Sequence, residues 1–125
     1  MSDYKNLVIW QKAFDLTMAI YDVADQFPVH EQYGLGDQIE RAVVSIPSNI
    51  AEGYGRSSDK EFYYFLNVAR GSLYEVQTQL YIAMGRNYID AEKAEKLNAS
   101  IDELGRMISG FLRRLEMKEP GLRKR

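Results

Sequence analysis

Apolar residues recur along the chain at steps of three and four positions, the spacing that places them on one face of an α-helix. They do so in four segments, separated by breaks at 26–31 around Pro28, at 53–58 and at 85–90. No segment shows the sustained alternation of a half-buried strand. The pattern predicts an all-α fold, and the short connections favour an antiparallel up-down-up-down four-helix bundle.

The first two segments each have a clear apolar face. The first is expected to begin near Asn6, a residue type that caps helices, and to end before Pro28. Pro47 removes a backbone hydrogen bond inside the second segment, but the apolar spacing continues past it, so we expect a kinked second helix. The expected core residues are Trp10, Ala13, Phe14, Thr17, Ile20, Tyr21, Ala24 and Phe27, followed by Leu35, Ile39, Ala42, Val43, Ile46 and Ile50.

The last two segments predict long helices. Ser58 and Glu61 have the spacing of a capping box, which marks the start of the third helix, and the fourth opens at Asp90. We expect residues 1–118 to form a single four-helix bundle domain and residues 119–125 a flexible basic tail. The expected core residues are Phe62, Leu66, Ala69, Leu73, Val76, Leu80 and Ala83, followed by Ala94, Leu97, Ile101, Leu104, Ile108, Phe111 and Leu115.

The third helix carries more apolar surface than one core can cover. The five consecutive residues 62–66 are all aromatic or leucine, and at about 100° per residue they point in every direction around a helix. Aromatic and arginine side chains are typical of protein interfaces, so we predict a homo-oligomer. Two alternatives stay open: the bundle and its loops cover the rings, or the rings stack on nucleic-acid bases. The candidate oligomer interface is Tyr63, Tyr64, Asn67, Arg70, Gly71, Tyr74, Gln77 and Tyr81.

A polar stripe runs beside the apolar face of the second helix. Arg41 and Glu52 are expected to pair with Glu75 and Arg70 of the third helix, because antiparallel neighbours bring such stripes together. A structural role that fixes the helix register is favoured over binding of a ligand. The candidate polar seam is Gln38, Arg41, Ser45, Asn49, Glu52 and Glu75.

The amino-acid composition limits the kinds of catalytic and metal sites that the chain can form. The 125 residues suit one domain, and the absence of cysteine excludes disulfides and thiolate metal sites. The only histidine, His30, lies in a break, and no Glu-x-x-His, catalytic triad or phosphate-loop pattern occurs. We therefore expect no enzyme, no cofactor, no metal and no small-molecule substrate. No apolar run or leader-like start suggests a membrane partner or export, so a cytoplasmic protein is expected.

The charge is unevenly distributed. Residues 106–125 contain seven basic and two acidic side chains, whereas the whole chain has a net charge of -2. The basic end either opposes the dipole of the last helix or meets an anionic partner such as RNA. The acidic body argues against strong RNA affinity. The candidate nucleic-acid residues are Arg113, Arg114, Arg123, Lys124 and Arg125.

The run QIERAVVSIPSNIAEG at 38–53 resembles the signature of the four helix bundle proteins encoded by intervening sequences of bacterial 23S rRNA genes. The likeness covers about residues 5–115, from Trp10 and Gln11 at the start to Gly71, Ser72 and Glu75 further on. It implies a four-helix bundle, a homo-oligomer with pentameric rings, and no established enzymatic activity. The accessory proteins of diversity-generating retroelements, which bind nucleic acid, are more distantly similar.

These observations together predict a non-catalytic homo-oligomeric protein that serves interaction or scaffolding. The alternative is an RNA- or DNA-binding accessory factor of a mobile element or of ribosomal RNA processing.

Overall fold

Four α-helices make up most of the chain in a computed structural model that describes residues 3–124. They are α1 (Val8–Ala24), α2 (Leu35–Tyr54), α3 (Asp59–Gly85) and α4 (Ala91–Lys118). Three short 3-10 turns accompany them: η1 (Tyr4–Asn6), η2 (Val29–Glu31) and η3 (Pro120–Lys124). No strand occurs within 3–124, so the prediction of an all-α protein with four helices is confirmed.

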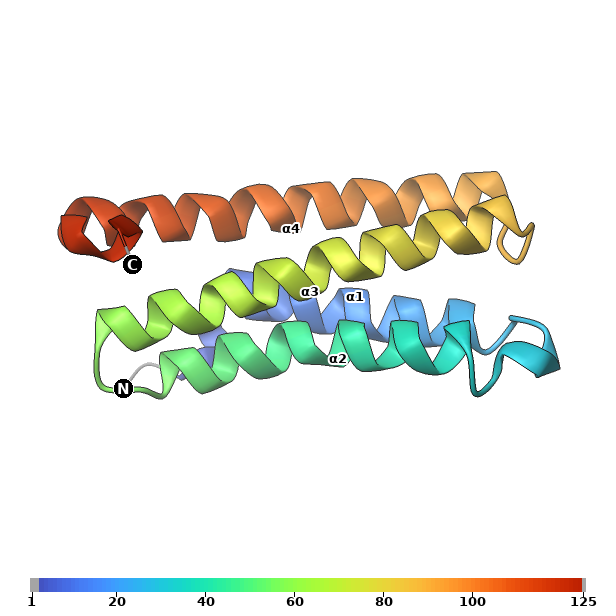
Figure 1. The fold of residues 1–125 in the computed structure, drawn as a ribbon, viewed down its shortest axis with the longest axis horizontal. Helices are drawn as coiled ribbons and strands as arrows, with labels where there is room; N and C mark the ends of the chain where they lie inside the picture. The colour runs from blue at the N-terminus through green and yellow to red at the C-terminus, as the bar shows by residue number, and fades with distance from the viewer. Residues whose placement is uncertain (1–2, 125) are drawn as a thin grey trace.

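The helices lie side by side along their length, with α1 and α3 running one way and α2 and α4 the other (Figure 1). Each of α1 and α3 packs against both α2 and α4. Helices α1 and α3 therefore occupy diagonal positions, and their outward faces look in different directions. No helix among the described residues is long and apolar enough to span a membrane.

The apolar faces predicted for α2 and α3 form the core as expected. All six predicted α2 residues and all seven predicted α3 residues are buried. In α4 the prediction also holds except at Phe111, which is only partly buried, while Leu112 beside it is 2% exposed. One row of aliphatic residues at helical spacing dominates each of these segments, so periodicity placed the core face correctly except at Phe111.

The core face predicted for the first helix is right in part: Ala13, Ile20, Ala24 and Phe27 are buried as expected, and Trp10 is partly buried. Ile9 and Leu16 are buried, whereas Phe14 and Tyr21, which were expected inside, are 45% and 37% exposed. The aromatic row lies about 140° around the helix from the aliphatic row, and packing on α2 and α4 selects the aliphatic one. Thr17 faces α2 and lies 3.3 Å from the carbonyl oxygen of Val43.

Helix ends follow the sequence signals in part. Ser58 caps α3, since its hydroxyl accepts the amide of Glu61, as predicted. Asn6 does not cap α1: it lies in η1, and Leu7 precedes the helix without a side-chain cap. Helix α2 continues through the buried Pro47 to Tyr54, and a kink there stays a prediction.

The C-terminal segment contacts the bundle. Where the sequence predicts a tail over 119–125, residues Pro120–Lys124 form η3 against α4, and Leu122 is 1% exposed in the same core as the helices. Lys118 Nζ lies 3.1 Å from a carboxylate oxygen of Asp59 and so ties the end of α4 to the start of α3. Arg125 lies outside the described residues.

Candidate interaction surface

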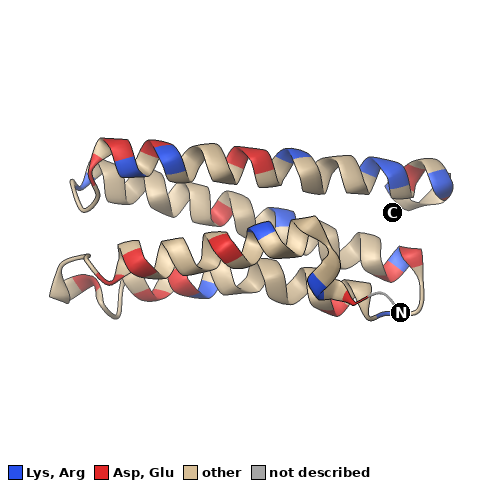
Figure 2. Ribbon diagram, turned by 180° about the vertical axis from the view of Figure 1, so that it is seen from behind, with Lys and Arg blue, Asp and Glu red and all other residues tan. Residues whose placement is uncertain are grey.

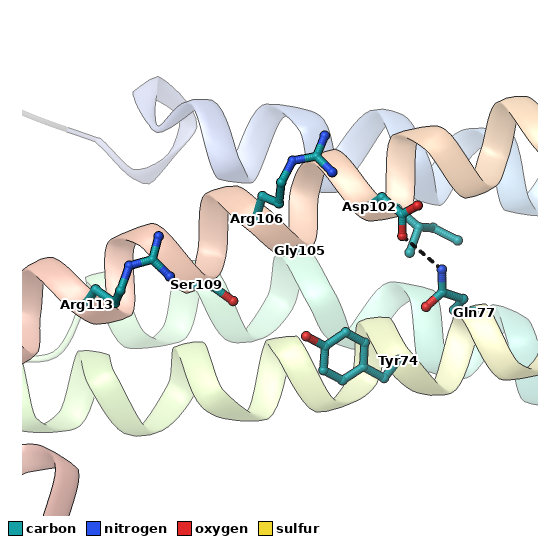
Figure 3. A pocket seen from close by; sticks show the side chains of 8 residues that line it. Tyr74, Gln77, Asp102, Gly105, Arg106, Ser109 and Arg113 are labelled. Atoms are coloured by element: carbon teal, nitrogen blue, oxygen red, sulfur yellow. Dashed lines mark hydrogen bonds between the residues drawn. The ribbon is translucent and has the colours of Figure 1, made fainter.

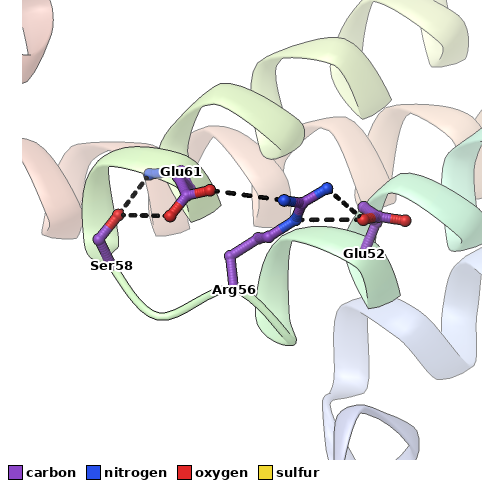
Figure 4. A network of polar contacts seen from close by, with 4 residues as sticks. All are labelled: Glu52, Arg56, Ser58 and Glu61. Atoms are coloured by element: carbon purple, nitrogen blue, oxygen red, sulfur yellow. Dashed lines mark hydrogen bonds and ion pairs between the residues drawn. The ribbon is translucent and has the colours of Figure 1, made fainter.

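A polar link joins the end of α2 to the start of α3 (Figure 4). Arg56 follows the end of α2, and its guanidinium donates to Glu52 Oε2 at 2.6 and 3.1 Å. The same group lies 3.7 Å from Glu61 Oε2, and Ser58 Oγ donates to Glu61 Oε1 at 3.2 Å. The link spans the short connection between the two helices, while the apolar residues buried in the core decide which side of α3 faces inward.

The eight residues predicted as an oligomer interface divide into two groups. Four of them hydrogen-bond within the chain, on the side of α3 that faces α4: Tyr63, Asn67, Arg70 and Gln77. The three bonds that cross between the helices are Tyr63 Oη to Glu116 Oε2 (2.5 Å), Arg70 Nη1 to Ser109 Oγ (3.2 Å) and Gln77 Nε2 to Asp102 Oδ1 (3.1 Å). These polar groups serve the α3–α4 contact.

The bond to Glu116 changes the acidity of Tyr63. The carboxylate accepts the phenolic hydrogen, and both this bond and partial burial disfavour the phenolate. The pKa of Tyr63 is therefore raised above its ordinary value. Tyr63 is thus a neutral hydrogen-bond donor inside the fold at physiological pH.

The other four predicted interface residues are exposed, and we call them the α3 surface: Tyr64, Gly71, Tyr74 and Tyr81. The three rings are 62%, 51% and 55% exposed. No atom lies within 4 Å of the position that a Cβ on Gly71 would take, so another helix could approach closely there. Ile82, which was not predicted, adds an aliphatic side chain that is 49% exposed.

A groove of about 350 Å³ lies between α3 and α4, next to the α3 surface (Figure 3). Tyr74 and Gln77 line it from α3, and Arg106, Ser109 and Arg113 are among the residues that line it from α4. Gly105 is also part of the lining and leaves room between the helices. The groove combines an aromatic ring, a hydroxyl, two guanidinium groups and the carboxylate of Asp102, which accepts a hydrogen bond from Gln77.

The arginines at this groove have no acidic partner among the described residues. Arg70 donates only to uncharged groups, and neither Arg106 nor Arg113 takes part in an ion pair within 3–124. Six other cations among the described residues, Lys12 and Arg41 among them, are paired with carboxylates. The lining of the groove holds two arginines and one carboxylate, Asp102, so it carries a small excess of positive charge although the whole chain has a net charge of -2.

The polar seam on α2 contacts α3 through small residues instead of charges. Ser45 Oγ and Ser72 Oγ lie 2.8 Å apart, and Asn49 Nδ2 donates to Ser45 Oγ at 2.9 Å. Gln38 and Glu75 are exposed.

The cross-helix ion pairs predicted for the seam are wrong. Arg41 pairs with Asp37 at 2.9 Å, and Glu52 pairs with Arg56. Each predicted partner is replaced by a residue four positions away on the same segment, which can be reached without ordering a second helix.

The basic C-terminal end is spread over several environments. Arg113 lines the groove, and the guanidinium of Arg114 lies 4.8 Å from the ring centroid of Phe111. Arg123 is exposed beside a second hollow with Tyr63 and Tyr64. The side chain of Lys124 and the whole of Arg125 lie outside the described residues, so the five predicted residues are not brought together as one site.

Sequence reasoning missed a second exposed row, on α1. Phe14, Met18 and Tyr21 are 45%, 54% and 37% exposed, and Val44 of α2 is 39% exposed. We call Phe14, Met18 and Tyr21 the α1 row. The sequence does contain this second apolar spacing on the first segment, but the prediction placed Phe14 and Tyr21 of this row in the core.

Among the described residues, no group of three histidine, cysteine or acidic side chains could hold a metal ion. His30 is exposed and lies 3.4 Å from the Tyr88 hydroxyl, which donates to Glu31 at 2.9 Å. These contacts join the α1–α2 connection to the α3–α4 connection.

The fold and its exposed aromatic rows define a small helical protein of the four-helix class. The sequence profile described as 23S rRNA-intervening sequence protein matches residues 5–110, and the chain belongs to this family. The resemblance noted from the sequence is thereby confirmed.

A solved structure supports the same assignment. The crystal structure of a protein of unknown function from the S23 ribosomal protein family of Bacteroides thetaiotaomicron matches with a TM-score of 0.77. The two sequences are 26% identical, and the match covers 84% of this chain and 98% of that one. Comparison with curated proteins gives no match.

Proposed function

We propose that this chain is a non-catalytic interaction or scaffold protein that associates with copies of itself through the α3 surface. The observation that carries the proposal is the exposure of three tyrosines on one helix, each more than half open to solvent. Exposed aromatic patches of this kind mark interaction sites in proteins. Tyrosine is also enriched among the residues that dominate binding energy.

The α3 surface has the right composition for the centre of an interface. A tyrosine can bury about 150 Å² or more, so the exposed parts of three rings offer on the order of 250 Å² per copy. A stable interface covers about 800 Å² per partner. Ile82 and the uncovered backbone at Gly71 extend the surface toward that size and let a neighbouring helix come close.

The proposal takes the subunit as an antiparallel up-down-up-down bundle with a bend at Pro47. In such a bundle the whole length of α3 from Tyr64 to Tyr81 presents one side to a neighbour. The resemblance to proteins that form pentameric rings favours a closed ring of five copies in the cytoplasm.

Light scattering on matched variants tests the role of the α3 surface. Tyr74→Asp/Tyr81→Asp places two charges in the proposed contact, and we expect the mass to fall to the 14.4 kDa of a single chain. Tyr33→Asp is the control, because Tyr33 is 89% exposed in the connection before α2. If the double variant keeps the wild-type mass, another surface holds the copies together.

A second candidate function rests on the basic groove. Arg113 and Tyr74 line one hollow, and a cation beside an aromatic ring can hold a phosphate and stack a base. An RNA- or DNA-binding factor would use this groove together with Arg114, Arg123, Lys124 and Arg125.

Binding to a structured RNA at low and at moderate salt tests the second candidate. A phosphate-driven contact weakens steeply as salt rises, so binding at low salt that fades at moderate salt supports it. No binding at either salt concentration removes this candidate.

A further inference from the structure

Each copy carries two apolar surfaces that are different from each other. The α1 row has the spacing i, i+4 and i+7, so Phe14, Met18 and Tyr21 lie along one side of the helix. Val44 of α2 is exposed too, on a helix that packs directly against α1. This spacing of anchors is typical of a helix that docks into a groove of a partner.

The two surfaces face away from one another. Helices α1 and α3 are diagonal in the bundle, because each packs on both α2 and α4. A two-fold contact would use one surface twice and leave the other in water, whereas a head-to-tail contact joins one surface to the other and buries both. The positions of the two rows therefore favour a head-to-tail contact between copies.

The charges beside the two surfaces are opposite. Acidic residues surround the α1 row by helical spacing and from the neighbouring α2: Asp15, Asp22, Asp25 and Glu40. None of these four takes part in an ion pair among residues 3–124. Figure 2 shows basic bands toward the C-terminal end of α4 and acidic bands, with some basic ones among them, on the lower helices.

Burial, and after it the charges of two neighbouring carboxylates, disfavours the ionised form of Glu40. Partial burial and the charges of Asp25 and Asp37 raise the pKa of Glu40 above its ordinary value. A cationic group brought against this side of the bundle would relieve that repulsion. The groove between α3 and α4 offers arginines that lack acidic partners.

We propose that the α1 row of one copy docks into the groove between α3 and α4 of the next copy, with the acidic residues beside the row facing Arg106 and Arg113. The inference rests on the proposed self-association and names its second surface. Phe14, Met18 and Tyr21 supply the buried anchors against Tyr74. The charges at the rim orient the contact and disfavour a contact between two α1 rows.

Charge reversal on each side, alone and together, tests this pairing. Asp22→Lys/Asp25→Lys and Arg106→Glu/Arg113→Glu each place like charges across the contact, and we expect each to weaken association at least about tenfold. The chain that carries all four changes restores opposite charges, so its affinity returns to within about threefold of wild type. Lys93→Glu/Glu95→Lys, exposed at the start of α4, is the control and leaves the mass unchanged.

Sedimentation equilibrium of the folded variants, checked by circular dichroism, separates the outcomes. If Asp22→Lys/Asp25→Lys assembles like wild type, or if the fourfold variant stays as dissociated as either double variant, the head-to-tail inference is overturned and association through α3 stands. If Arg106→Glu/Arg113→Glu keeps the wild-type oligomer mass but no longer binds RNA, the groove binds nucleic acid and not a second copy. That result also overturns the inference. If the wild-type chain itself sediments as a monomer, the proposed function of self-association is contradicted.

Discussion

The side-chain oxygens of Ser45 and Ser72 lie 2.8 Å apart where α2 packs on α3. Asn49 donates to the same Ser45 oxygen at 2.9 Å, so the Ser45 hydroxyl is held between two partners. Both serines are half-buried, and their small size lets the two helices approach closely. This contact holds α2 and α3 together at one point along their length.

Removal of one serine should weaken the bundle. Ser72→Ala is expected to lower the free energy of unfolding by about 1 kcal/mol, because a half-buried hydrogen bond is lost. Urea unfolding of Ser45→Ala, Ser72→Ala and the double variant measures the coupling between them. Ser48→Ala, at an exposed position of α2, should change little. Strictly additive effects of the two serines would show that their contact contributes nothing.

Gly53 is required by the close approach of α2 and α3. A Cβ on this residue would lie 2.7 Å from the Cβ of Phe65 and 3.0 Å from Cδ1 of Phe62. Gly53→Ala should therefore destabilise the protein by about 1–3 kcal/mol, since the helices must move apart.

Gly85→Ala is the matched control for Gly53→Ala. No atom lies within 4 Å of its Cβ position, so the added methyl group meets nothing. Thermal unfolding of the two variants checks the difference. Equal melting temperatures for them would contradict the steric account of Gly53.

The long helices were predictable because one apolar spacing dominates each of them. Leu66, Leu73 and Leu80 recur every seven residues of α3 and are all fully buried. Ser58 and Glu61 also marked the start of that helix correctly. In such segments local sequence and tertiary packing agree, so periodicity is sufficient.

The first helix was harder because it carries two apolar rows. Ile9 and Leu16 form one row, and Phe14 and Tyr21 form the other. The prediction from sequence placed the row with the larger aromatic side chains in the core. Only the positions of α2 and α4 decide which row is inside, and these positions are not encoded in the spacing of α1. The exposed aromatic row therefore became visible only in the folded chain.

Cross-helix polar partners were missed for a different reason. Glu52 was expected to reach α3, but Arg56 lies four residues further along and forms the pair instead. A partner on the same segment needs fewer ordered side chains than a partner on another helix. The contact that does cross, between Ser45 and Ser72, has no charge: Ser45 was placed in the predicted polar seam, but Ser72 was not predicted as its partner.

The fold should lose stability in acid partly through Glu31. Its carboxylate accepts the amide of Leu35 at 3.0 Å and the hydroxyl of Tyr88 at 2.9 Å, and the first of these bonds contributes most to lowering its pKa. A carboxyl group whose pKa is lowered by folding stabilises the fold above its unfolded pKa. That contribution is lost as pH falls through the lower, folded pKa.

Glu31→Gln tests this pH dependence. The variant should be less stable than wild type at neutral pH, and the difference should shrink as pH falls below about 4.5. Glu95→Gln, at an exposed residue of α4, should follow the wild-type profile. A stability difference for Glu31→Gln that is the same at neutral and acid pH would show that the carboxylate charge has no role.

Self-association through the α3 surface is tested most directly by the mass of the wild-type protein in solution. Sedimentation equilibrium across the micromolar range should give a multiple of the 14.4 kDa chain mass. Tyr64→Ala/Tyr74→Ala/Tyr81→Ala should sediment as a folded single chain under the same conditions. A wild-type protein that sediments at 14.4 kDa throughout that range, with its three tyrosines open to water, would contradict the account.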